Sequence, residues 1–325
     1  VVNDGRQLVS QGYMELLGLI EQIETDDLTS SVVIRMAQLQ GDILALLGRL
    51  NEAETVLNDT LERAQSTAGE LVQAEILSSL ADVSRKQGNS ELSLNRHKAA
   101  LKHYISLGNA RWAARTYNNI GYLLRRKNER NKALEAYGEV EAILESSDDD
   151  ELIYSQITLA RSLIELGEVD RAREHAMASH ERTSALGDGV LHARAQAVLG
   201  RYYSKVEQSE LALFHYSEAL SAMTEAGDVQ SLVEITMLLG EVLHDAGRTE
   251  EAVEHYSQAL VLAEANDLRM QIGELLTRLG GVAPDRQGRM EYLQRALTVF
   301  RELGAKSRMR EAVSYTHLTL PTKVY

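Results

Sequence analysis

Residues 199–216 read LGRYYSKVEQSELALFHY and place small and aromatic residues at a fixed spacing. Gly200 is followed by Ala212 after twelve residues and by Tyr216 after sixteen. Small residues let two helix axes approach closely, while larger residues fill the space beside them. The pattern therefore predicts two packed helices. The same spacing recurs at Gly121, Ala133 and Tyr137 and at Gly240, Ala252 and Tyr256.

Residues that commonly end helices mark a repeat of about forty residues. Glycine or Asn just past a helix adopts the left-handed conformation that other residues adopt only at a cost. Two interleaved series predict two helices in each unit, as in a solenoid. The first series is Gly48, Gly88, Asn128, Gly167, Glu207 and Gly247, and the second is Gly108, Ser147, Gly187, Gly227, Asn266 and Gly304.

Over residues 8–313 the chain resembles the tetratricopeptide repeat family, whose signature is similar to Leu199-Gly200-x-x-Tyr203 followed by Ala212-x-x-x-Tyr216. The period is forty rather than the usual 34 residues, and the proline that usually closes the second helix is missing. Both departures are similar to the long variety in kinesin light chains and in the sensor arms of signalling ATPases. The resemblance implies an all-α, right-handed superhelical solenoid of antiparallel helix pairs.

The register divides the chain into four parts. Residues 1–30 are expected to form an incomplete N-terminal repeat, with a helix over 8–25, and residues 31–304 seven helix pairs. Residues 305–313 align with the start of another repeat. Residues 314–325, SYTHLTLPTKVY, have no repeat register, which favours a non-native tail over a genuine short one. The chain therefore looks like the middle of a longer protein.

Composition narrows the classes of partner. The formal net charge of the 325 residues is −14, so no net basic field attracts a nucleic acid. The sequence has no cysteine and no run of about eighteen apolar residues, which argues against thiolate metal sites and membrane spans. His175 and His180 lie five residues apart, a poor spacing for a shared metal. We expect a cytoplasmic protein without metal, cofactor or enzymatic activity.

The family resemblance implies that the first helices line a concave groove. Its side chains are expected six and three residues before each small residue, and one, four and five after it. Asn can pair with a peptide backbone, and Arg with carboxylates. In the sequence, Glu75 and Asp82 precede the basic residues of this predicted groove, and Glu234 follows them. The predicted groove residues are Arg115, Asn118, Asn119, Tyr122, Arg125, Arg126, Tyr154, Arg161, Arg194, Arg201 and Lys205.

Two functions fit these observations. The first is a scaffold that binds a protein or peptide, with an acidic segment in the basic centre of the groove. The second is the sensor arm of a larger signalling protein, such as an ATPase-coupled transcription regulator. Ordinary solvated helix charge is the plainer interpretation of the basic residues. An enzyme is the least favoured class, because no activated nucleophile, metal set or acid–base pair is visible.

Overall fold

The computed structural model describes residues 2–23, 29–147, 149–303 and 305–317, and every regular element in these ranges is helical. The predicted all-α fold of antiparallel helix pairs is confirmed. Contacts between Cα atoms divide the chain into two compact units. Asp4–Ser162 is called the N-terminal unit, and Leu163–Tyr325, to which Val1–Asn3 is assigned, is called the C-terminal unit.

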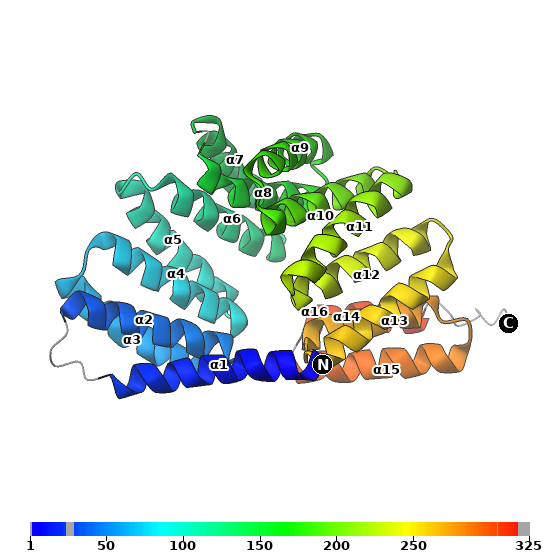
Figure 1. Ribbon diagram of the computed structural model, residues 1–325, viewed down its shortest axis with the longest axis horizontal. Coiled ribbons are helices and arrows are strands. Elements are labelled where there is room, and N and C mark those ends of the chain that lie inside the picture. Colours follow the sequence, from blue (N-terminus) through cyan, green and yellow to red (C-terminus); the bar gives the residue numbers. More distant parts are fainter. Residues whose placement is uncertain (1, 24–28, 148, 304, 318–325) are drawn as a thin grey trace. The chain divides into compact units, whose positions relative to one another are not determined.

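The N-terminal unit contains three helix pairs, each made of a first and a second helix (Figure 1). A helix was expected over 8–25 but α1 begins at Val2, because the polar start of the chain gives no apolar period that would mark the boundary. The elements are α1 (Val2–Gln22), α2 (Ser30–Leu46), α3 (Leu50–Thr67), α4 (Glu70–Lys86), α5 (Ser90–Ser106), α6 (Ala110–Arg126), α7 (Arg130–Glu145), the 3₁₀ helix η1 (Asp150–Leu152) and the start of α8 (Ile153–Leu166).

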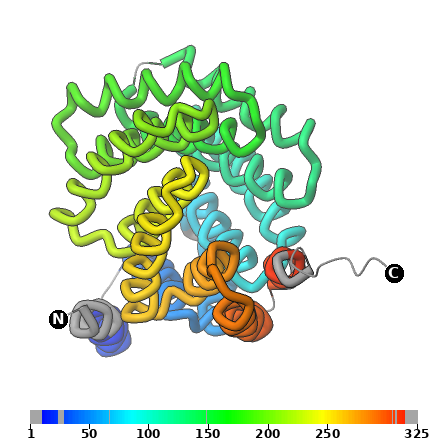
Figure 2. The backbone as a smooth tube through the Cα atoms, turned by 90° about the vertical axis from the view of Figure 1, so that its right-hand side faces the viewer, coloured from blue at the N-terminus to red at the C-terminus, as the bar shows by residue number. Residues whose placement is uncertain are grey.

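The C-terminal unit continues the same alternation, with consecutive helices lying beside one another (Figures 1 and 2). Residues 314–317, where no register was expected, complete the last helix, and residues 318–325 lie outside the described chain. Ala312 of that helix is fully buried. The helices are α9 (Val169–Leu186), α10 (Gly189–Lys205), α11 (Ser209–Ala226), α12 (Val229–Asp245), α13 (Thr249–Ala265), α14 (Arg269–Val282), α15 (Arg286–Glu302) and α16 (Lys306–His317).

Glycines of the first helices contact large buried side chains of the second helices. A Cβ atom added to Gly121 would lie 2.7 Å from Cζ of Tyr137, and one added to Gly200 would lie 2.6 Å from Cδ1 of Tyr216. Such distances are shorter than any van der Waals contact, and both tyrosines are fully buried. Only glycine therefore fits at these positions while the ring stays in place, so the contact fixes how the two helices of a pair pack.

The turns follow the first predicted series throughout and depart from the second at Asn266 and Ser147. All six residues of the first series have positive φ, including the non-glycine residues Asn128 at 61° and Glu207 at 60°. In the second series Asn266 has a φ of −111°, and the left-handed residue is Asp267 at 48°. The Asn266 side chain instead donates to the carbonyl of Leu262 at 2.9 Å, so it caps the helix from within. Ser147 is not left-handed, and Gly304 lies outside the described residues.

His97 of α5 occupies the repeat position that Tyr137 and Tyr216 hold in other pairs, opposite Ala81 rather than glycine. The side chain is 1% exposed, and within the described part of the chain neither ring nitrogen has a hydrogen-bond partner. Burial lowers the pKa of His97 to about 4. A neutral imidazole is therefore part of the core of the N-terminal unit.

We predict that His97→Leu makes the fold less sensitive to acid. The unfolded chain protonates this imidazole near pH 6.5 and the folded chain only near pH 4, so the parent loses stability as the pH falls through this window. The loss amounts to at most roughly 3 kcal/mol. Leu is the residue at the equivalent position 57. Urea unfolding of parent and variant at several pH values measures the difference, and parallel stability curves would contradict the assignment.

Candidate functional site

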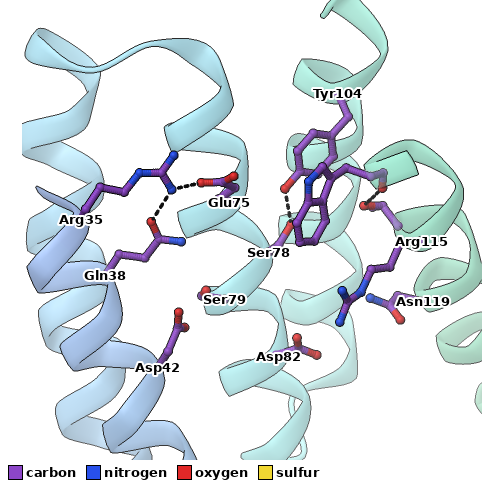
Figure 3. A pocket seen from close by; sticks show the side chains of 12 residues that line it. Arg35, Gln38, Asp42, Glu75, Ser78, Ser79, Asp82, Tyr104, Arg115 and Asn119 are labelled. Atoms are coloured by element: carbon purple, nitrogen blue, oxygen red, sulfur yellow. Dashed lines mark hydrogen bonds and ion pairs between the residues drawn. The ribbon is translucent and has the colours of Figure 1, made fainter. Parts of the chain in front are cut away.

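A polar pocket of about 430 Å³ lies between the first helices α2, α4 and α6 of the N-terminal unit (Figure 3). All the helices that contribute to it belong to this unit. Its volume is within the range of about 300–1,000 Å³ that is typical of ligand pockets. The lining residues are Arg35, Gln38, Asp42, Glu75, Ser78, Ser79, Asp82, Tyr104, Trp112, Arg115, Thr116 and Asn119.

The repeat register explains why these side chains converge. Most of them occupy the positions six or three residues before a small residue, or one residue after it. Because the small residues pack in the same way in successive pairs, these positions come to lie on one face, which we call the first-helix face. The residues concerned are Arg35, Gln38 and Asp42 around Gly41, Glu75, Ser78 and Asp82 around Ala81, and Arg115 before Gly121.

Arg115 is held by aromatic rings rather than by an acid. Its guanidinium carbon lies 5.2 Å from the ring centroid of Trp112 and 5.5 Å from that of Tyr154, which is 41% exposed. Among the described residues, Arg115 has no carboxylate within ion-pair distance, whereas the neighbouring Arg111 pairs with Glu151 at 3.0 Å. The two rings contact the flat face of the guanidinium and orient the group. The edge of the guanidinium stays available for the two parallel hydrogen bonds that a carboxylate accepts.

Trp112 is itself fixed by the layer behind the pocket. Its ring stacks on Tyr104 with centroids 5.8 Å apart, and the Tyr104 hydroxyl is 3.2 Å from that of Ser78. Burial raises the pKa of Tyr104 to about 12, so the phenol remains protonated and neutral. The pocket therefore has a rigid aromatic wall in contact with Arg115.

The opposite wall is acidic. Glu75 forms an ion pair with Arg35, and Asp82 lies 3.4 Å from Arg85. Asp42 is half-buried, and burial raises its pKa above the ordinary value, although a hydrogen bond with Ser79 acts in the other direction. Among the described residues, Asp42 has no cation within ion-pair distance. Positive and negative groups thus face the same cavity from different helices.

A second group of predicted residues surrounds Tyr122 further along α6. The guanidinium carbons of Arg125 and Arg126 lie 5.5 and 5.9 Å from the Tyr122 ring, and Arg126 donates to the Tyr122 hydroxyl at 3.1 Å. Arg126 is exposed, and so is Arg161 on α8. Within the N-terminal unit, the predicted basic residues therefore include several that are accessible to a ligand.

Asn118 corrects the sequence-based expectation. It was predicted to face a ligand, but its side chain is 3% exposed and donates through Nδ2 to the carbonyl of Ser155 at 3.0 Å. The prediction is wrong because α8 covers this position, whereas Gln38 and Ser78 at the equivalent positions remain partly exposed and line the pocket. The neighbouring Asn119 is the amide that lines the pocket.

The remaining predicted residues lie on α10 in the C-terminal unit. Arg201 forms an ion pair with Glu234, and Arg194 lies 3.5 Å from Asp228. Both arginines are paired because acidic residues of α12 and its N-cap lie against them. Lys205 is exposed. In this part of the chain, an acidic ligand would have to displace existing ion pairs.

Sequence reasoning missed much of the pocket. The positional rule was applied to Gly121 and its neighbours but not to Gly41, where it would have indicated Arg35, Gln38 and Asp42. Trp112 packs near the start of α6, where its ring stacks on Tyr104. Nothing in the sequence pattern showed that Trp112 also lines a cavity.

No group of His, Cys, Asp or Glu among the described residues is arranged to hold a metal ion. In the same part of the chain, no helix combines the length and the apolar character that crossing a membrane requires.

We predict that Asn118→Ala and Asn119→Ala have different effects. Asn118→Ala should lower the free energy of unfolding by about 1–3 kcal/mol, because it removes a buried hydrogen bond between α6 and the Ser155 carbonyl of α8. Asn119→Ala should leave stability nearly unchanged, because this side chain is partly exposed at the pocket. Chemical unfolding of the two variants measures both changes. Equal losses would show that the burial of the two amides has been misassigned.

Solved structures with a similar fold were found at low sequence identity. A Rap protein complexed with competence and sporulation factor is 13% identical, with a TM-score of 0.62 and 97% of each chain covered. The Rap conjugation gene regulator of the plasmid pLS20, in complex with the Phr* peptide, is 16% identical, with a TM-score of 0.57 and coverage of 78% of this chain and 76% of that one. Identities this low show the fold alone.

A signal transduction ATPase with numerous domains and a tetratricopeptide repeat sensor, from Pyrococcus horikoshii, is 12% identical with a TM-score of 0.57. The match covers 95% of this chain and 52% of the ATPase. No curated protein matched the sequence. Models of the tetratricopeptide repeat family match residues 72–146, 153–176 and 234–258. The predicted family is therefore confirmed over these residues, which match tetratricopeptide repeats.

Proposed function

We propose that the chain is a binding scaffold that captures a peptide, or an extended segment of a partner protein, on the first-helix face of the N-terminal unit. The observation that carries the proposal is the polar pocket between α2, α4 and α6, with the oriented guanidinium of Arg115 at its edge. Hydrogen-bonding side chains and an aromatic wall are the features that protein and peptide sites combine.

The proposed ligand carries an acidic residue or a free C-terminal carboxylate. Arg115 supports this preference because its edge is available and its orientation is fixed, so little side-chain entropy is lost on binding. Arg126 on α6 and Arg161 on α8 are exposed and add positive charge to the two helices that carry Arg115 and Tyr154. Exposed charges of this kind mainly raise the association rate and respond strongly to salt.

The fold is compatible with this role. Two of the similar structures are complexes of Rap proteins, one with competence and sporulation factor and one with the Phr* peptide. The similarity to the ATPase with a repeat sensor supports a second candidate, in which the chain is the sensor arm of a larger signalling protein. A nucleotide-binding loop in the same natural chain would favour this candidate. A protein partner, the absence of nucleic acid and membrane ligands, a non-enzymatic role and a cytoplasmic location remain predictions.

Trp112 provides a direct assay, because it is the only tryptophan and lines the pocket. We predict that short acidic peptides with blocked ends change its fluorescence on titration and bind at least tenfold more tightly than neutral peptides of the same length, about 1.4 kcal/mol. Arg115→Gln should remove most of this difference, because it removes the charge and the bidentate donors.

Lys98→Gln is the matched control. Lys98 is an exposed cation on α5 outside the pocket, so its loss changes the net charge equally but should alter peptide affinity little. Isothermal titration calorimetry provides a readout that does not depend on the indole, whose surroundings Arg115→Gln changes. If Arg115→Gln and Lys98→Gln weaken acidic peptides equally, the preference for acidic peptides comes from the net charge of the protein and not from Arg115. Failure of a diverse peptide library to bind the parent would contradict the proposed function.

A further inference from the structure

The C-terminal unit shows what closes the space between consecutive first helices. Arg201, one residue after Gly200 on α10, forms an ion pair with Glu234, six residues before Gly240 on α12. Further along the unit, Glu241 of α12 pairs with Arg278 of α14, and Glu274 of α14 pairs with Arg308 of α16 at 2.5 Å. Opposite charges from adjacent first helices therefore satisfy one another along this face.

The equivalent residues in the N-terminal unit have opposite charges but do not meet. Asp82 follows Ala81 on α4, and Arg115 precedes Gly121 by six residues on α6, so they occupy the positions of Arg201 and Glu234 with the signs exchanged. Asp82 contacts Arg85 of its own helix, and Arg115 lies against two aromatic rings. The pocket lies where an ion pair between them would close the face, with both residues in its lining (Figure 3).

Asp42 adds a second acceptor on the same side. Asp42 follows Gly41 on α2, so by analogy with Arg201 and Glu234 it would pair with the residue six positions before Ala81 on α4. That residue is Glu75, which is also negative and is paired with Arg35. Lys86 interacts favourably with both Asp42 and Asp82, but its ammonium donates to the carbonyl of Ala45 at 2.9 Å, so it offsets only part of their charge. The acidic wall thus retains acceptors for a cation.

We infer that the pocket takes a bipolar peptide segment, in which one carboxylate binds Arg115 and a neighbouring Lys or Arg side chain binds Asp82 and Asp42. The inference rests on the proposed peptide-binding function and names the chemistry that the same site selects. The bound segment would supply a carboxylate to Arg115 and a cation to Asp82. In the C-terminal unit, the equivalent residues Arg201 and Glu234 satisfy each other directly. No bond is made or broken, so the site is a recognition site.

Purely acidic or purely basic segments fit less well. An acidic segment satisfies Arg115 but brings its charge toward the desolvated carboxylate of Asp42, and like charges that are close together and poorly solvated oppose binding. A basic segment satisfies Asp82 and Asp42 but leaves the guanidinium edge of Arg115 covered without an acceptor. Arg115 on one side of the pocket and Asp82 and Asp42 on the other therefore disfavour purely basic and purely acidic peptides, respectively.

The test uses the full chain and four sets of blocked peptides of one length, containing acidic, basic, both or neither kind of residue. Binding is followed through Trp112 fluorescence and by isothermal titration calorimetry. We expect the bipolar set to bind about fivefold more tightly than the acidic set, as one added half-exposed ion pair would give. Asp82→Asn should remove most of this gain, because only Asp42 remains to bind the cation, while acidic peptides should bind at least as tightly as they bind the parent, which also shows that the pocket is intact.

Arg115→Gln should have the complementary effect, removing the advantage of the bipolar set over the basic set. The possible outcomes distinguish failure of the proposed peptide binding from failure of the bipolar preference alone. If no set binds the parent, the proposed function fails. If acidic peptides bind but an added basic residue gives no gain, or if the gain survives in Asp82→Asn, the peptide-binding function stands and the bipolar inference is overturned.

Discussion

A glycine of one helix in contact with an aromatic ring of its partner sets the packing of the helix pairs. At Gly121, Gly200 and Gly240, the missing side chain leaves room for a buried tyrosine, so the two helices of each pair meet at a fixed position. Because the register recurs about every forty residues, the positions around each small residue are presented in the same way in successive pairs. The side chains at these positions then determine what each unit can bind.

The same scaffold has two different surfaces. In the C-terminal unit, residues such as Arg201 and Glu234 pair across adjacent first helices, which uses their charge to hold the repeats together. In the N-terminal unit, aromatic contacts hold Arg115, and the space beside it remains open as a polar pocket. A difference of a few side chains at equivalent positions therefore separates a structural surface from a candidate recognition surface. Function is argued from these side chains because the fold alone is compatible with many partners.

Most of the fold could be predicted from the sequence because repetition multiplies weak signals. A single Gly-Tyr spacing is ambiguous, but its recurrence with left-handed turn residues predicts helix pairs and their approximate bounds. The turn at Asn266 was shifted by one residue because the Asn side chain caps its own helix, a local choice that propensity does not reveal.

The candidate site was less predictable, for reasons of three-dimensional contact. Position in the repeat places a residue on a face but does not say whether a neighbour covers it, as α8 covers Asn118. Nor does position indicate pairing, which depends on the charge that the next helix supplies, as for Arg201. The contact of Arg115 with Trp112 follows from their three-residue spacing on α6, but its contact with Tyr154 joins α6 to α8 and no local pattern encodes it.

The most direct test of this account is a double-mutant cycle in urea unfolding at Gly121 and Tyr137, with Gly138→Ala as control, since a Cβ at Gly138 meets nothing within 4 Å. We predict that Gly121→Ala lowers the free energy of unfolding by about 1–3 kcal/mol, while Gly138→Ala does not lower it. Adding Tyr137→His reproduces the Ala81 and His97 combination of the preceding pair and should recover part of the loss. Equal stability of Gly121→Ala and Gly138→Ala, or fully additive losses in the double variant, would contradict the claim that this contact sets the helix packing.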